Sequence, residues 1–482
     1  MQTFSKRKNH GRGQADRMPL SVLGLIVALL VNAGVSAAAR DNLPIGPVSG
    51  SEMALAGAQQ VWEFQLPLGY TGSIRSYQLM DGVIYAVGTD GVIRAVRADT
   101  GQPIWTRPIA TAFDAVWGPV SAEFKDIGQT AAFSLAGEVI FLNVENGRPV
   151  KRLSLQRPNI TGVAVGRENV YQPQVHRRLE CLRRNDGIRQ WAKTLPGLLE
   201  LTPVLLSASG VELLAFADSV GTLAVVGADG EDRFVRDLGA RPTGWLAADE
   251  EAVYAATLDM RLHGIERISG TPLWRFPLAG QPIGGPVVTQ KAVYQAAEKA
   301  GLYRIEIPEI ETRPIPAEDD KDQLWAEDGQ ESVQKRVPVT LPAGKLVVWN
   351  HAEGKRFLAE WPNRVAVLRK DGLVALIRPD DRTGRAAELL QVSPDAEGLS
   401  NPYNDAIILT TPGGHLWCMR PVGAPALTLD DFCSSAPHAD GEQPTAEPPS
   451  EKPAAEKSEP GVLTTDELLL TDPLRSEKPL TP

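Results

Sequence analysis

The chain has 482 residues and a formal net charge of −10. Its basic and acidic residues are interspersed instead of forming blocks, which argues against a nucleic-acid partner. The length alone predicts about three average domains, but the internal repeats described below favour one large ring.

The first 39 residues have the order of a secretory signal peptide. Residues 1–17 are basic, residues 20–35 are mostly apolar, and the small residues that follow offer cleavage sites. The apolar run is short for a membrane span, which needs about 20 residues, although an uncleaved anchor is the alternative. We therefore expect residues 1–39 to direct export to the periplasm or the cell surface, and residues 40–60 to form a linker.

The stretch Ile84–Trp105 defines a repeating unit. Two predicted strands are separated by a tight turn at Asp90 and Gly91, where a residue must take a positive φ. A second turn at Gly101 leads into a third strand that opens with Trp105. This pattern is typical of consecutive antiparallel strands.

The same pattern returns along the chain, and in three copies a glycine stands four residues ahead of a tryptophan. These pairs are Gly101 and Trp105, Gly187 and Trp191, and Gly270 and Trp274. Weaker copies begin near Ala132, Leu214, Val293, Val365 and Ile407. Copies start about 40 residues apart, except for one gap of about 72, and a four-stranded propeller blade needs about 40–50. We expect an all-β fold, an eight-bladed β-propeller of four-stranded antiparallel blades over residues 61–433, with seven blades as the alternative.

The long gap lies in the sixth copy. Its strand at residues 302–307 is followed by an acidic, proline-containing stretch, residues 308–344, before the expected tryptophan, Trp349. An insertion at a surface turn adds little loop-closure cost, so we interpret it as a loop within one blade and not as a domain boundary. Its acidic run Glu318–Asp322 lacks the glycine and the ligand spacing of a calcium loop, which favours a solvated loop over a calcium site.

The two ends of the repeat array complement each other. The last copy stops after Pro421 without its final strand, and residues 61–66, which include Trp62, are similar to residues 273–278. An N-terminal strand that completes the last blade would close the ring and remove exposed strand edges.

The three cysteines allow two interpretations. Cys181 and Cys418 fall at the position that Ala95 occupies in the first copy, which predicts buried free thiols. A Cys418–Cys433 disulfide is the alternative in an oxidising compartment, and it would leave Cys181 free.

Residues 434–482 are rich in proline, glutamate, serine and lysine and have too few apolar residues to bury, so we expect a disordered C-terminal tail. Within this tail, the locally apolar segment Gly461–Leu470 is either a docking motif or a chance cluster.

No catalytic, cofactor-binding or metal-binding residue is predicted. The six histidines form no i, i+4 pair, and no serine nucleophile elbow is present. Five arginines crowd the third copy, where they either present a basic face to an acidic partner or lipid headgroups, or are ordinary solvated residues. They are Arg177, Arg178, Arg183, Arg184 and Arg189.

Over residues 61–420, the recurring tyrosine, glycine and tryptophan positions resemble the repeat of pyrroloquinoline-quinone-type (PQQ-like) β-propellers. The resemblance implies that a tryptophan packs between adjacent blades. It assigns this role to Trp62, Trp105, Trp191, Trp274 and Trp349. Phe234 takes the place of the tryptophan in the fourth copy, whereas Lys151 and Glu388 depart from the pattern and predict looser contacts.

The family contains quinoprotein dehydrogenases, which bind the quinone and calcium over the ring centre, and non-catalytic propellers of outer-membrane assembly. Short blades, no adjacent cysteine pair and no ordered cluster of calcium ligands favour similarity to the second branch. We therefore expect an exported, non-enzymatic scaffold for protein–protein interaction in the cell envelope, monomeric and without a cofactor. The alternative is a dehydrogenase-like enzyme that uses PQQ and calcium.

Overall fold

The computed structural model describes residues 50–69, 72–208, 211–309, 312–314, 336–393 and 395–433. All of them belong to the first of two compact units, residues 1–436. The predicted signal peptide and the predicted tail at residues 434–482 lie outside the described residues. No helix among the described residues is long and apolar enough to cross a membrane.

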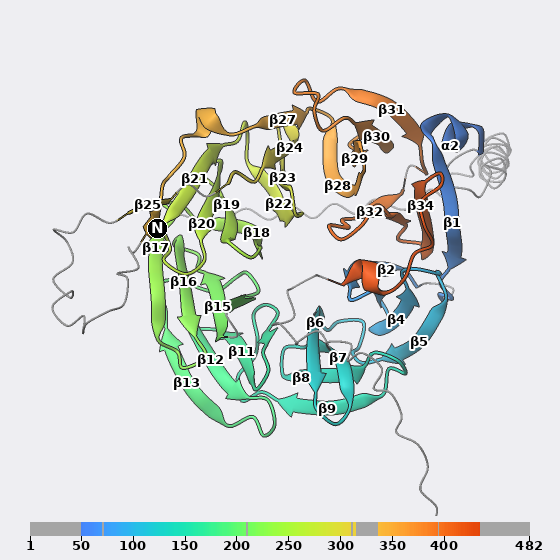
Figure 1. Cartoon of the computed structure of the whole chain (residues 1–482). Coiled ribbons are helices and arrows are strands. Elements are labelled where there is room, and N and C mark those ends of the chain that lie inside the picture. Colours follow the sequence, from blue (N-terminus) through green and yellow to red (C-terminus); the bar gives the residue numbers. More distant parts are fainter. Residues whose placement is uncertain are drawn as a thin grey trace, which may run out of the picture. The chain divides into compact units, whose positions relative to one another are not determined.

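Eight four-stranded antiparallel sheets follow one another around a ring (Figure 1). Blade 1 contains β2 (Ile74–Met80), β3 (Val83–Gly88), β4 (Val92–Arg97) and β5 (Pro103–Pro108). Blade 2 contains β6 (Trp117–Phe124), β7 (Gly128–Ser134), β8 (Glu138–Asn143) and β9 (Pro149–Ser154). Blade 3 contains β10 (Ala164–Val165), β11 (Asn169–Gln174), β12 (Arg178–Arg183) and β13 (Arg189–Thr194). Blade 4 contains β14 (Val204–Ala208), β15 (Val211–Ala217), β16 (Thr222–Gly227) and β17 (Asp232–Asp237).

The second half of the ring repeats this order. Blade 5 contains β18 (Pro242–Ala248), β19 (Ala252–Thr257), β20 (Arg261–Glu266) and β21 (Pro272–Pro277). Blade 6 contains β22 (Pro282–Val288), β23 (Ala292–Ala297), β24 (Gly301–Glu306) and β27 (Val348–His351). Blade 7 contains β28 (Gly354–Trp361), β29 (Arg364–Arg369), β30 (Leu373–Ile377) and β31 (Ala386–Gln391). Blade 8 contains β32 (Glu397–Leu399), β33 (Ile407–Thr410), β34 (His415–Pro421) and the N-terminal β1 (Ala58–Gln65).

The apolar core is distributed over the contacts between successive blades, which we call seams. In blade 1 all residues of β3 are buried, because both faces of this strand are covered by neighbouring blades. The outer strand β5 buries Trp105 and exposes Pro103, Thr106 and Pro108. The buried apolar residues of the described chain form eight clusters, and each cluster joins two successive blades.

The predicted ring closure is confirmed. β1 pairs antiparallel with β34, so that Trp62 lies opposite Cys418 and Glu63 opposite Trp417. The strand begins at Ala58, before the expected boundary at Val61, and the short helix α2 (Gly50–Ala56) precedes it. Eight blades are therefore complete, and the seven-bladed alternative is wrong.

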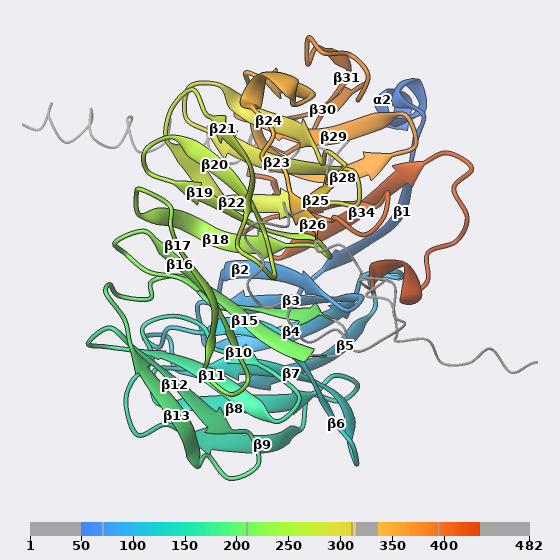
Figure 2. The ribbon, with the colours of Figure 1, turned by 60° about the vertical axis from the view of Figure 1, so that its left-hand side comes forward.

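The segment that follows β34 packs back onto the ring. It contains the 3₁₀ turn η4 (Asp430–Phe432), and Phe432 is fully buried in the cluster that joins blades 8 and 1. Leu429 lies against Gly82 of the β2–β3 turn. Figure 2 shows this segment beside the blade 1 strands.

The insertion of the sixth copy lies between two strands of the same sheet, β24 and β27. It contains an antiparallel pair, β25 (Thr312–Pro314) with β26 (Arg336–Pro338), and the 3₁₀ turn η3 (Ala343–Lys345). On its return to blade 6, Leu341 forms a parallel bridge with Trp274 of blade 5.

Candidate interaction sites at the blade seams

An aromatic ring from the fourth strand of one blade lies on a turn glycine of the next blade. The glycine belongs to the connection between the third and fourth strands, which we call the outer turn. A Cβ atom added to the glycine would come within 3 Å of the ring, so only glycine allows this close packing. The four pairs are Trp62 with Gly101, Trp105 with Gly147, Trp191 with Gly230, and Phe234 with Gly270. The predicted seam role of these aromatic residues, including the replacement by Phe234, is confirmed.

Three of the seam tryptophans also make a hydrogen bond to the next blade. Their indole N–H groups donate to a main-chain carbonyl at the start of the outer turn. The donor–acceptor distances are 2.9 Å for Trp62 to Ala98, 2.7 Å for Trp105 to Val144, and 2.8 Å for Trp191 to Ala228. Ring packing and a directional bond together fix the position of one blade against the next.

Hydrogen bonds are present at the seams of Lys151 and Glu388, where looser contacts are predicted. The Lys151 ammonium donates to the carbonyl of Asn185, which is at the outer turn of blade 3, so the link between blades persists without an aromatic ring. Glu388 accepts a hydrogen bond from Arg364, which also donates to the carbonyl of Ala56 at the end of α2. At this seam the N-terminal helix therefore supplies part of the contact.

The seam between blades 6 and 7 contains a buried polar network that the sequence analysis missed. Arg304 occupies the position of Ala95 in blade 1 and is only 5% exposed. Its guanidinium donates to the Tyr294 hydroxyl, and that hydroxyl donates to Glu360 of blade 7 at 2.6 Å. Burial, together with the charge of Glu360, raises the pKa of Tyr294 well above its ordinary value, so the phenol stays protonated and donates.

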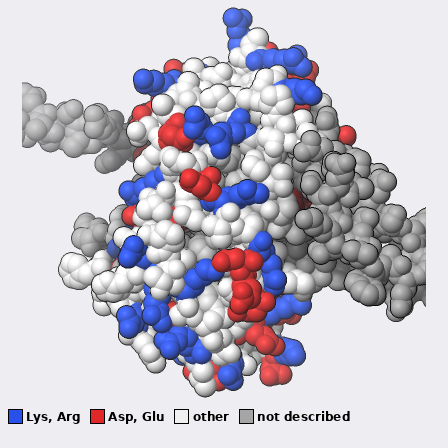
Figure 3. Space-filling model, turned by 90° about the vertical axis from the view of Figure 1, so that its left-hand side faces the viewer, with Lys and Arg blue, Asp and Glu red and all other residues white. Residues whose placement is uncertain are grey.

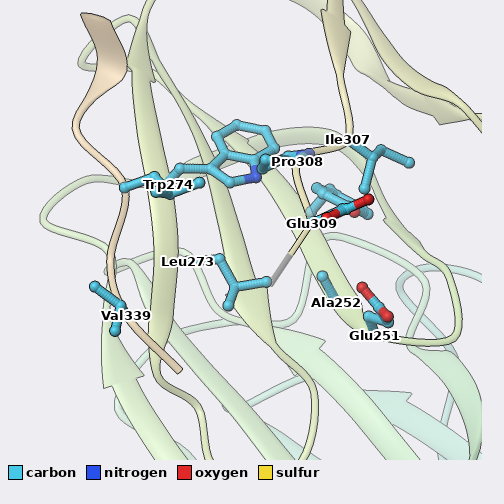
Figure 4. Close-up of a pocket in the computed structure, with 10 residues that line it drawn as sticks. Glu251, Ala252, Leu273, Trp274, Ile307, Pro308, Glu309 and Val339 are labelled. Carbon is cyan, nitrogen blue, oxygen red and sulfur yellow. The ribbon is translucent and has the colours of Figure 1, made fainter. Parts of the chain in front are cut away.

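Trp274 departs from the hydrogen-bonding pattern. It is 1% exposed, and its indole N–H has no partner among the residues that the structure describes. The next blade is blade 6, in which the insertion replaces the short outer turn that supplies the acceptor for Trp62, Trp105 and Trp191. A pocket opens here between β21 and the end of β24, lined by Leu273, Trp274, Ile307 and Glu309 among others (Figure 4).

A sequence model of the family described as outer membrane protein assembly factor BamB matches residues 30–205 and 219–392. The chain belongs to this family. The fold is similar to BamB from Moraxella catarrhalis, at 14% identity and a TM-score of 0.52 over 76% of this chain and 99% of that chain. It is also similar to the computationally designed Ika8 protein, at 14% identity and a TM-score of 0.50 over 75% and 99% of the two chains. No curated protein matches the chain.

The calcium ion of a calcium-bound quinone needs oxygen ligands such as carboxylates. Among the residues that the structure describes, no three histidine, cysteine, aspartate or glutamate side chains gather as a metal site. The acidic run Glu318–Asp322 lies outside the described residues.

Four of the five arginines of blade 3 contact an acidic or aromatic side chain. Arg178 and Arg189 both approach the buried carboxylate of Glu180, at 2.8 and 3.6 Å. Arg183 pairs with Asp186. Arg184 is 7% exposed, and its guanidinium lies 4.2 Å from the ring centre of Phe124. On the side of the ring shown in Figure 3, positive and negative side chains are mixed.

The cysteines of this BamB-family chain are all free, and the Cys418–Cys433 disulfide is absent. Cys181 and Cys418 are buried at the seam position of Ala95, as predicted, and burial raises the pKa of both thiols to about 12. Cys433 is exposed, and its thiol points to the carbonyl of Leu429.

Proposed function

We propose that this chain is an exported, non-enzymatic scaffold that binds other proteins of the cell envelope during outer membrane protein assembly. The observation that carries the proposal is the family match, which covers both halves of the propeller and whose description names that process. The 14% identity to the solved BamB structure supports only the fold. The partner is a protein of the envelope, and the ring acts as a monomer.

The form of the ring supports binding in preference to catalysis. Strands within a blade are joined by short turns, such as the one between β3 and β4, which leave little chain to wall a cofactor pocket. The long connection in blade 6 is the exception, and it emerges at a seam and not over the ring centre. A rigid ring with two faces of short loops is well suited to holding partners in fixed positions.

Recovery of partners tests the proposal. The full-length chain, tagged at its C-terminus, would be expressed with its own first 39 residues, and its partners would be captured from envelope extract and identified by mass spectrometry. We expect an exported protein that has lost its signal peptide and that recovers envelope proteins. Retention in the cytosol, or recovery of no envelope protein, would contradict the proposal.

We also propose that the ring binds no quinone. Purified protein titrated with pyrroloquinoline quinone and calcium should show no stoichiometric change in absorbance or melting temperature. A stoichiometric change in either would support the enzymatic alternative and overturn the scaffold proposal.

A further inference from the structure

In the described sheets, the outer strand of each blade has a neighbouring strand on one side only. Free strand edges invite pairing with other chains, and proteins commonly protect them with proline or with charged side chains, lysine above all. Five of the eight outer strands contain proline, lysine or arginine, namely β5, β9, β13, β17 and β21. β27 has only four residues, and β31 contacts α2.

The remaining outer strand, β1, has an unprotected edge. It has eight residues, none of them proline, lysine or arginine, and its only charged residue is Glu63. Figure 1 shows β1 at the outer rim of blade 8, with no other described strand outside it. β1 is therefore the edge of this ring that is best suited to pairing with another chain.

Blade 5 shows how an outer edge of this ring pairs with an extended segment. Leu341, on the return path of the insertion, forms a parallel bridge with Trp274 of β21. The main-chain N–H of Leu341 donates to the carbonyl of Leu273 at 2.7 Å. Leu273 is the extra residue of a β-bulge, because its neighbours Pro272 and Trp274 pair with consecutive residues of β20. The bulge leaves the Leu273 carbonyl facing outward, where an added segment reaches it.

β1 has the same bulge at the equivalent place. Gln60 and Trp62 pair with consecutive residues of β34, so Val61 is the extra residue and corresponds to Leu273. The Val61 carbonyl therefore faces outward, and the alternation of an antiparallel ladder turns the N–H of Glu63 the same way. Val61 is 40% exposed, and no described residue forms a bridge to this side of β1. An outward acceptor and an outward donor are thus free to pair with an added strand.

The charge of this edge favours a basic partner segment. Residues 50–65, which include α2 and β1, contain two glutamates, Glu52 and Glu63, and no lysine or arginine. Glu63 is exposed, and its carboxylate accepts a hydrogen bond from the Gln60 amide at 3.2 Å. Side chains opposite one another on paired strands have Cβ atoms about 5 Å apart, so a lysine or arginine there attracts Glu63 and an acidic residue repels it.

We propose that the outer edge of β1 binds an extended segment of a protein partner as an added strand, with lysine or arginine opposite Glu63. The main chain of the segment donates to the Val61 carbonyl and accepts the Glu63 N–H. In this mode of recognition main-chain hydrogen bonds provide affinity, and side chains select the partner. This inference rests on the proposed function, because it gives the scaffold a specific edge for recognition.

Hydrogen exchange of the full chain, measured at single residues, tests the pairing directly. The probe is a blocked peptide of alternating valine and lysine, and the same peptide with glutamate in place of lysine is its control. Main-chain pairing should slow exchange of the Glu63 amide, whereas contact through side chains alone should not. β5, whose edge contains Pro103, Arg107 and Pro108, should gain no protection. Unchanged exchange at Glu63, or equal protection by the glutamate peptide, overturns the inference.

Removal of the outward donor gives a second test. Glu63→Pro deletes this N–H and leaves the ladder to β34 in place. It should weaken binding of the lysine peptide, measured by fluorescence anisotropy, about fivefold or more. Thr106 follows Trp105 in β5 as Glu63 follows Trp62, so Thr106→Pro is the matched control and should bind normally. Equal affinities of the two variants would contradict pairing at β1.

Charge reversal tests the choice of partner without a change in backbone conformation. Glu63→Lys should weaken binding of the lysine peptide about fivefold and strengthen binding of the glutamate peptide. Thr106→Lys is the matched control and should change neither affinity. If Glu63→Lys binds the lysine peptide as tightly as the wild-type chain does, a basic partner segment is ruled out.

A second copy of the chain is the other occupant that a free edge could take. Light scattering of the full chain should show a monomer at the concentrations of the binding assays. A dimer that Glu63→Pro dissociates would assign the edge to a second copy and overturn the inference.

Capture from envelope extract with the wild-type chain, Glu63→Pro and Thr106→Pro separates this inference from the proposed function. A protein that Glu63→Pro loses and the other two chains recover supports the edge, together with the peptide result. Identical recoveries by all three chains overturn the edge alone, whereas no recovery by the wild-type chain overturns the scaffold proposal itself.

Discussion

His263 lies in the middle of β20, is 3% exposed, and its Nε2 atom is 3.1 Å from the Thr257 hydroxyl. Burial, and secondarily the positive charge of Arg275, lowers the pKa of His263 from 6.5 to about 4. Between these two values the unfolded chain holds a proton that the folded chain does not. The free energy of unfolding therefore falls as the pH decreases through this window, by about 3 kcal/mol in total.

The variant His263→Gln removes this titration while keeping a polar side chain. We expect its unfolding free energy, measured in urea between about pH 7 and about pH 4, to depend less on pH than that of the wild-type chain. The variant His176→Gln, at an exposed turn, is the control. Identical pH slopes for wild type and His263→Gln would contradict this assignment.

The cysteines give a second prediction at the residue scale. Cys181 and Cys418 are buried and stay protonated because burial raises their pKa to about 12. Cys433 is exposed. A thiol reagent such as Ellman's reagent should therefore react with one cysteine in the native chain and with all three after unfolding. Rapid reaction of a second native thiol would show that a seam opens.

At the scale of strands and turns, the contact between an aromatic ring and a turn glycine predicts how much a glycine-to-alanine substitution lowers the free energy of unfolding. Gly147 has a φ of +64°, and a Cβ atom there would come 2.5 Å from the Trp105 ring. Gly128 has a φ of +83°, but no atom lies within 4 Å of its Cβ position. Alanine at either site adopts a strained backbone, and only alanine at position 147 also collides with the seam.

We therefore expect Gly147→Ala to lower the free energy of unfolding by about 2 kcal/mol more than Gly128→Ala. Urea denaturation of both variants against the wild type measures the difference. Equal losses of unfolding free energy in the two variants would mean that backbone strain alone destabilises them. The Trp105 ring would then move aside to accommodate the added methyl group.

The architecture could be predicted from sequence because each blade repeats the same positions. The glycine and tryptophan spacing predicts turn and strand, and the orphan strand around Trp62 predicts ring closure. Contacts between blades were harder to predict, because they join side chains from different copies. Neither the Lys151 bond to Asn185 nor the missing acceptor of Trp274 follows from one repeat alone. The bridge between Leu341 and Trp274 needs the return path of the insertion, which no local pattern indicates.

At the scale of the whole molecule, β1 completes blade 8 and leaves β34 paired on both sides. A chain that begins at Gly50 keeps β1, whereas a chain that begins at Pro67 lacks it. We expect the first to be monomeric with one cooperative transition. The second should self-associate and melt at a lower temperature, because β34 then presents an open edge and the Trp62 seam is lost.

Size-exclusion chromatography with light scattering, together with calorimetry, distinguishes these outcomes. The chain from Gly50 is the matched control, because it lacks the segment before α2 but retains the closing strand. A monomeric chain from Pro67 with an unchanged melting temperature would mean that closure contributes little to stability.

The order of synthesis gives the pairing of β1 with β34 a further consequence. β1 is the first strand to be synthesised and β34 is the last. Blade 8 therefore cannot assemble until synthesis of the chain is almost complete. Until then, nascent or partly translocated molecules carry two unsatisfied strand borders that can join those of neighbouring molecules. We therefore expect the protein to depend on chaperones that bind the unfinished chain. Aggregation should be most frequent when translation pauses shortly before β34 is made.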